Sequence, residues 1–267
     1  MTVISAILTR QCTAISSDSL ITEVRDNGSR IPVEWERSKV ARIPKFRGSA
    51  SYWGLATYGR WSTFDWLQSQ ARAAEAFDTL EEFARSFRQS LENELAKLRF
   101  RNPIDSGIGI HLTGYEHIDG YWIPELLLCS NFADPSYSRI CCLHLSRETF
   151  HTLNNVPSAD EHREPRFRLS VKDALQNGAM LIYNNGDPLM FNPSAKSFLQ
   201  LISTIRQRGL LNDPDSPATY RSIARRPIEI VSAAQQDFCR AGTRFVGGRI
   251  HDLVVTPAGE YSSTSGD

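Results

Sequence analysis

The sequence of 267 residues lacks several features that would place it in a broad class at once. No apolar run approaches the ~20 residues that span a bilayer, and no basic segment followed by an apolar leader opens the chain. Lysine plus arginine and aspartate plus glutamate both number 30, so no net field draws the protein towards nucleic acid or an anionic membrane. We therefore expect a soluble, cytoplasmic protein with no nucleic-acid and no membrane partner.

Motifs for metals and cofactors are also missing. The six histidines are scattered, without an H-E-x-x-H pair or a similar cluster. The five cysteines are odd in number and lie in apolar runs, which favours reduced core residues over a disulfide framework. The adjacent Cys141 and Cys142 have no second pair at zinc-type spacing, and no phosphate-binding P-loop is present. The sequence thus predicts no metal and no cofactor.

What the chain does contain is 41% hydrophobic residues, enough to bury a substantial core. Their periodicity predicts an order of strands, two helices, strands, two helices and a strand. This segregated order favours an α+β fold with antiparallel sheets over regular βαβ winding. The expected strands are residues 2–8, 12–18, 38–43, 49–57, 107–115, 121–130, 138–145, 179–183 and 250–256, and the expected helices are 61–74, 80–98, 194–208 and 218–240, the last divided or kinked at Pro227.

The domain organisation follows from the segments between these elements. Residues 25–36 are charged and contain Gly28 and Pro32, which indicates a loop, and the polar residues 154–166 form another. No internal repeat is visible. We expect one domain over residues 1–257 and a flexible tail over 258–267, which is rich in serine, threonine and glycine.

The first forty residues carry the most chemistry. Two apolar runs joined by residues 9–11 predict a hairpin that places Thr2 near Asp18. Removal of Met1 before a small residue leaves Thr2 with its own amine as a base for its hydroxyl. That amine, with a reference pKa of roughly 7.7–8.0, becomes a better base for neutral pH beside a cation that lowers its pKa. Lys39 is the candidate cation, which Asp18 would orient and keep charged.

These residues resemble the proteasome β-subunit superfamily of N-terminal-nucleophile hydrolases. The spacing from Thr2 to Asp18 fits that family, whereas Lys39 lies several residues further along. The resemblance implies a four-layer αββα sandwich that cleaves peptide or amide bonds through an acyl-enzyme on Thr2, in a homo-oligomer that can form a ring and work with a separate unfoldase. It runs through Thr2 and residues 16–19, 38–43, 52–56 and 246–248.

Supporting groups are less well defined. The resemblance implies an oxyanion donor on a glycine after the strand that follows Lys39, for which we prefer Gly59, while Gly54 suits strand packing. Ser17 has a supporting role at most, and Asp187, in an Asn-Gly-Asp-Pro turn, stands where the family carries a supporting serine. Residues 243–246 depart from the family's aspartate and serine.

Each candidate residue also has a plainer interpretation. Asp18 can cap a turn, Lys39 can be a solvated strand residue, and Asp187 can simply belong to its turn. Two further functions therefore stay open beside the hydrolase. One is an inactive scaffold or binding subunit, recognised by a retained Met1, and the other is a small-molecule amidase, recognised by a monomeric or dimeric assembly.

Overall fold

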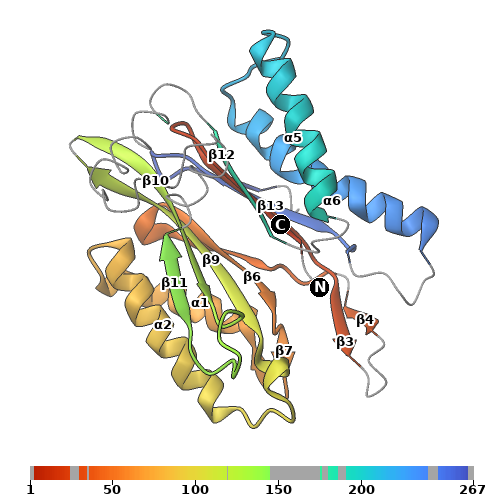
Figure 1. Cartoon of the computed structure of the whole chain (residues 1–267). Helices are drawn as coiled ribbons and strands as arrows, with labels where there is room; N and C mark the ends of the chain where they lie inside the picture. Colours follow the sequence, from red (N-terminus) through yellow and green to blue (C-terminus); the bar gives the residue numbers. More distant parts are fainter. Residues whose placement is uncertain are drawn as a thin grey trace, which may run out of the picture.

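The fold is a mixed α+β arrangement whose strands pair antiparallel (Figure 1). It is described by a computed structural model for residues 3–24, 30–34, 36–118, 120–144, 175, 180–185, 191–239 and 246–263. The α+β class with antiparallel sheets, expected from the order of strands and helices, is confirmed. None of the helices in these ranges is long and apolar enough to cross a membrane.

Two five-stranded sheets form the centre of the molecule. The first sheet has the order β12 (Leu181–Asn185), β1 (Ile4–Leu8), β2 (Thr13–Asp18), β13 (Ile250–Val255) and β14 (Tyr261–Ser263). The second sheet has the order β11 (Cys141–His144), β10 (Tyr121–Ser130), β9 (Ile108–Ile118), β6 (Gly48–Gly54) and β5 (Val40–Ile43). Two small ribbons pair β3 (Ile21–Val24) with β4 (Arg30–Glu34), and β7 (Thr57–Tyr58) with β8 (Trp61–Ser62).

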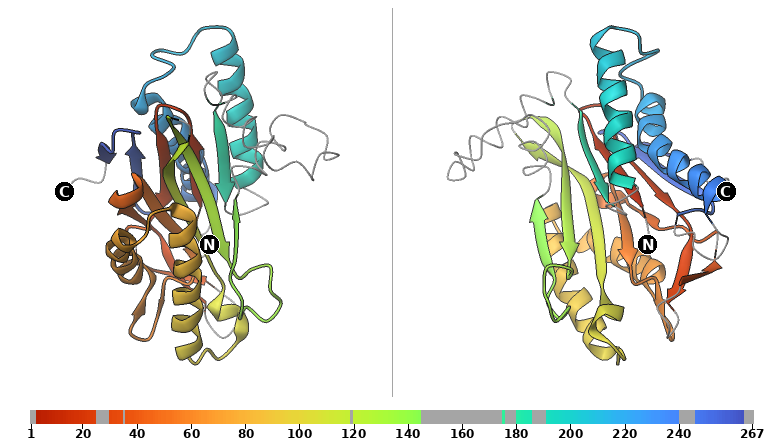
Figure 2. Two further views of the ribbon diagram at one scale, coloured as in Figure 1. Left: turned by 90° about the vertical axis from the view of Figure 1, so that its left-hand side faces the viewer. Right: turned by 45° about the vertical axis from the view of Figure 1, so that its right-hand side comes forward.

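The helices lie against the sheets in two pairs, which the views of Figures 1 and 2 place on opposite sides of the molecule. The first pair is α1 (Thr63–Ala73) and α2 (Leu80–Lys97), and the second is α5 (Phe191–Gln207) and α6 (Pro217–Phe238). Short 3-10 turns cover Pro44–Phe46, Ala74–Ala76 and Pro103–Ser106.

Helix α2 shows how the sequence encodes these elements. The Thr79 hydroxyl accepts a hydrogen bond from the Glu82 amide at 3.1 Å and so caps the first turn. Apolar residues then recur at helical spacing and are buried, among them Phe83, Phe87 and Leu91. Helix α6 begins in the same way at Ser216 and continues through Pro227 to Phe238. Of the division or kink expected at Pro227, the division is therefore wrong.

Apolar clusters join the layers. Residues of the second sheet such as Leu112 pack with Phe83 and Phe87 of α2, and Ile7 of the first sheet packs with Ile223 of α6. A third cluster lies between the two sheets and contains Ile4 and Leu126. Close packing of this kind fixes the relative positions of the strands that carry the candidate residues.

The hairpin expected at the start of the chain is present. β1 and β2 pair with Ile4 opposite Ser17, and the Asp18 amide donates to the Val3 carbonyl at 3.3 Å. The strand expected at residues 121–130 is β10, with the same bounds. The sequence therefore placed Asp18 correctly at the end of a strand paired with the start of the chain.

Two expectations about irregular segments are wrong. Residues 30–34, expected as loop, form β4, which pairs with β3 and makes a ribbon between Asp18 and Lys39 in the sequence. Within the expected tail, Tyr261–Ser263 form β14 and pair with β13 at the edge of the first sheet. Both strands are short, and their pairing partners rather than their own composition make them strands.

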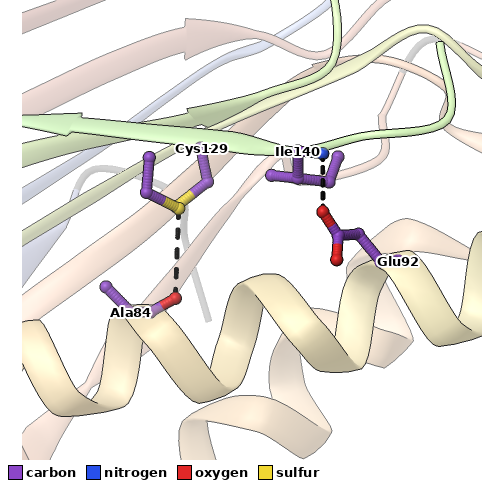
Figure 3. The surroundings of a disulfide bond; sticks show 5 residues. Ala84, Glu92, Cys129 and Ile140 are labelled. Atoms are coloured by element: carbon purple, nitrogen blue, oxygen red, sulfur yellow. Dashed lines mark hydrogen bonds between the residues drawn. A yellow bond between two sulfur atoms is a disulfide. The ribbon is translucent and has the colours of Figure 1, made fainter. Parts of the chain in front are cut away.

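The expectation of reduced cysteines is wrong for one pair. Cys129 and Cys142 stand directly opposite each other on β10 and β11 and form a disulfide (Figure 3). Next to it, the amide of Ile140 donates to the Glu92 carboxylate of α2 at 2.8 Å. Counting cysteines could not predict this bond, because strand pairing brings the two residues together. Cys12, Cys141 and Cys239 are free thiols.

Candidate functional site

Asp18 lies at the end of β2 in the first sheet, where its side chain is fully buried. Its Oδ1 accepts a hydrogen bond from the Val3 amide at 3.0 Å, and its Oδ2 accepts one from the Gly247 amide at 3.4 Å. Two backbone donors therefore hold the carboxylate from both sides. Contacts of this kind favour the ionised form of a carboxyl group.

Lys39 reaches the same point from the second sheet. It immediately precedes β5, and its carbonyl accepts a hydrogen bond from the Tyr52 amide of β6 at 3.2 Å. Its side chain, 1% exposed, places Nζ 3.3 Å from Asp18 Oδ1 and 2.7 Å from the Leu20 carbonyl oxygen. The ion pair thus spans the junction between the two sheets.

Burial sets the electrostatics of this pair. Loss of solvation raises the pKa of Asp18, against the opposing effects of the Lys39 charge and the Val3 amide. The same loss of solvation lowers the pKa of Lys39, and the Asp18 charge and hydrogen bond oppose it. In both groups burial is the larger effect, so each depends on its partner to stay charged.

Two of the predicted site residues fall outside the described part of the chain. These two residues are Thr2 and Asp187. Val3, the residue that follows Thr2, is fully buried and is held at the Asp18 carboxylate by its amide. The structure therefore brings together Asp18, Lys39 and the first described residue of the chain.

The other predicted residues have structural roles in their described contacts. Ser17 is fully buried, and its hydroxyl donates to the Asp18 carbonyl at 3.0 Å, which supports the end of β2. Gly54 ends β6 with φ +85°, and a Cβ there would lie 2.2 Å from the Gly107 carbonyl oxygen. These facts agree with the strand-packing role expected for Gly54.

Gly59, the preferred oxyanion donor, lies in the turn between β7 and β8. Its φ of +57° suits this turn, the residue is exposed, and a Cβ there would meet no atom within 4 Å. An oxyanion donor works best where water is excluded, so the exposed turn is a weaker position than the sequence suggested.

Sequence reasoning missed the backbone groups of the site. The Leu20 carbonyl binds Lys39, and the Gly247 amide binds Asp18, while Leu20 and Gly247 also bond each other through the Leu20 amide and the Gly247 carbonyl at 3.1 Å. Main-chain donors and acceptors leave no mark in a side-chain pattern. The only available signal was the glycine pair Gly247 and Gly248, where Gly248 has φ +74°.

A hollow of about 450 Å³ lies elsewhere, at the turn ends of the β1–β2 and β9–β10 hairpins. Its lining includes Arg10, Gln11, Trp122 and Pro257. Arg10 and Asp18 flank opposite ends of β2, so this hollow is separate from the buried pair. The buried, hydrogen-bonded charges of Asp18 and Lys39 are the feature that can shift the pKa of a reacting group, and they form the candidate site.

Within the described ranges, no group of three or more histidine, cysteine, aspartate or glutamate side chains is arranged to hold a metal ion. The sequence matches no protein-family model, and a comparison with curated proteins finds no significant match.

Proposed function

We propose that the protein is a threonine-type N-terminal-nucleophile hydrolase that cleaves peptide or amide bonds with Thr2 after removal of Met1. The observation that carries this proposal is the buried ion pair of Lys39 and Asp18, held against the amide of Val3. A buried lysine held at the start of the chain is the group that would lower the pKa of a terminal amine. The two sheets, with a helix pair on either side, fit the four-layer αββα sandwich expected from the resemblance to N-terminal-nucleophile hydrolases.

In the proposed reaction the Thr2 hydroxyl oxygen attacks the carbonyl carbon of the substrate. Its proton passes through water to the Thr2 amine, which later protonates the leaving nitrogen as the amide C–N bond breaks. The product is an ester of Thr2 and a free amine. Water then attacks the ester, the acid is released and the Thr2 hydroxyl is restored.

The pair has two tasks in this mechanism. Lys39 provides the positive charge that keeps the Thr2 amine unprotonated near neutral pH. Asp18 accepts from both Lys39 and the Val3 amide, so it fixes the lysine relative to the start of the chain. The oxyanion donor is left without an assignment, since Gly59 lies in an exposed turn.

The test is intact mass spectrometry of the purified chain after exposure to an electrophile that needs both the amine and the hydroxyl of an N-terminal threonine. We expect loss of Met1 and one adduct per chain, abolished in Thr2→Ala and at least tenfold slower in Lys39→Met. Lys97→Met is the matched control, because Lys97 pairs with Glu94 on the surface and is 66% exposed. Retained Met1 without an adduct would overturn the proposal and leave a scaffold or binding subunit as the function.

Assembly and location complete the proposal. We propose a homo-oligomer, supported by exposed apolar residues on α5 and α6 such as Leu201, Ile230 and Phe238. Light scattering of the purified chain tests this, and a monomer or dimer would favour a small-molecule amidase. The Cys129–Cys142 bond stands against the proposed cytoplasmic location, because disulfides are rare in that reducing compartment. Trapping of free thiols in freshly lysed cells tests that part.

A further inference from the structure

We propose that Gln235 is a positioning residue for the Asp18–Lys39 pair, an inference that rests on the proposed hydrolase function. Gln235 lies near the end of α6 and is fully buried. Its Oε1 accepts a hydrogen bond from the Val246 amide at 3.0 Å. This contact ties the helix to the segment that reaches the candidate site.

Gly247, which follows Val246, makes two hydrogen bonds to the residues at and just after the end of β2. The Gly247 amide donates to Asp18 Oδ2 at 3.4 Å, and its carbonyl accepts from the Leu20 amide at 3.1 Å. Asp18 and Leu20 are also the two acceptors of the Lys39 ammonium. A shift of Gly247 would therefore move both groups that fix the position of Lys39.

The contacts thus form a continuous path from α6 to the ammonium. Gln235 holds Val246, Gly247 holds Asp18 and Leu20, and these two hold Lys39. Neutral glutamine suits the first position because its amide oxygen accepts a backbone N–H without adding a charge near the pair. Small displacements of reacting groups cost large factors in rate, so this support matters for reactivity and not only for stability.

The variant that tests this role is Gln235→Met, which keeps the length of the side chain and removes the acceptor. We expect the Thr2 adduct to form roughly 10- to 100-fold more slowly, since the cation is displaced from the position that the proposed mechanism requires. The pH at which the adduct rate is half-maximal should also rise, because a displaced Lys39 lowers the pKa of the amine less. Gln235→Asn, whose amide is one methylene shorter, replaces this variant if Gln235→Met does not fold, with the same expectation.

The matched control is Val231→Ala, one turn earlier on α6. Val231 packs in the same cluster as Val3 and Val246 but makes no side-chain hydrogen bond. We expect it to lower the melting temperature and to leave the adduct rate within about twofold of the wild type. Gln235→Met reacting as fast as the wild type, or Val231→Ala reacting as slowly as Gln235→Met, would overturn the positioning role.

A second measurement separates this inference from the proposed function. If the wild type forms no adduct, the positioning role can still be tested by the melting temperatures of Gln235→Met, Lys39→Met and the double variant. We expect the two effects to depart from additivity by about 2 °C or more, whereas Val231→Ala and Lys39→Met should add. Additive effects for the Gln235 pair would refute the positioning role whatever the protein's activity.

Discussion

Removing Lys39 and removing Asp18 should make the stability of the protein depend on pH in opposite directions. In Lys39→Met the Asp18 carboxyl stays buried without its cation, so the folded state keeps it protonated. In Asp18→Asn the Lys39 amine stays buried without its anion, so the folded state keeps it neutral. Each variant then pays the free energy of changing the protonation state of one group.

The free energy of this change in protonation sets an upper limit on the stability that each variant loses. At pH 7, protonating a carboxyl with an unfolded pKa of ~3.9 costs at most about 4.2 kcal/mol, and deprotonating an amine with an unfolded pKa of ~10.4 costs at most about 4.6 kcal/mol. The backbone contacts that remain, from Val3 to Asp18 and from Lys39 to Leu20, reduce both values. For 267 residues, 4 kcal/mol corresponds to a fall in melting temperature of about 7 °C.

The signs follow from linkage. In Lys39→Met the folded pKa of Asp18 is raised, so stability is greatest near pH 4 and falls by about 1.4 kcal/mol per unit as pH rises. In Asp18→Asn the folded pKa of Lys39 is lowered, so stability rises with pH by the same amount per unit up to about pH 10. In the wild type the pair binds the same number of protons in both states near neutral pH, and it contributes no slope.

Urea unfolding at pH 6, 7 and 8 measures these slopes relative to the wild type. The double variant Asp18→Asn/Lys39→Met should show no slope and should recover stability relative to both single variants, because no buried charge is left unpaired. Lys97→Met, on the surface, should change stability by less than about 1 kcal/mol at every pH. Slopes of the same sign in the two single variants would refute the description of the pair as buried and mutually dependent.

Three further predictions concern other parts of the fold. Burial lowers the pKa of His111, stacked on Trp53, to about 3, so the stability it contributes is present above pH 6.5 and lost as pH falls towards 3. Between pH 6.5 and 4.5 the urea unfolding free energy should drop by about 2.3 kcal/mol, and an equal drop in His111→Leu would contradict this assignment. Gly54→Ala should lower the unfolding free energy by roughly 3 kcal/mol or more, because φ is positive there and the new Cβ would meet the Gly107 carbonyl. Gly59→Ala, in open space, should lower it by about 1 kcal/mol. Thermal unfolding measures both losses, and equal losses would show that the close approach at Gly54 is relieved. Reduction of the Cys129–Cys142 bond, with a sequence separation of 13, should lower the unfolding free energy by about 3 kcal/mol, and an unchanged midpoint in a dithiol reductant would count against the bond.

The sequence predicted those parts of the site that depend on local pattern. The hairpin of β1 and β2 follows from two apolar runs and a short turn, and it places Asp18 beside Val3. The approach of Lys39 to Asp18 was predicted from the order of residues and the resemblance, and the structure brings the two side chains together. Their catalytic roles, and that of Thr2, stay predictions.

The parts that could not be predicted depend on contacts between distant segments. Gly247 reaches Asp18 across 229 positions through a backbone amide, which has no side-chain signature. Cys129 and Cys142 meet because β10 and β11 pair in one register, which composition does not reveal. β4 is a strand because β3 pairs with it, although its own residues include Pro32, which disfavours a central strand.

The position of the ion pair at the junction of the two sheets bears on the order of events during folding. Asp18 ends a strand of one sheet and Lys39 immediately precedes a strand of the other, so neither sheet alone forms the pair. β13, which flanks β2, and Gly247, which bonds Asp18, lie 229 or more positions further along the sequence than Asp18. Before these segments have joined the first sheet, the ion pair is not assembled, and the proposed nucleophile would lack the cation that the mechanism assigns to it.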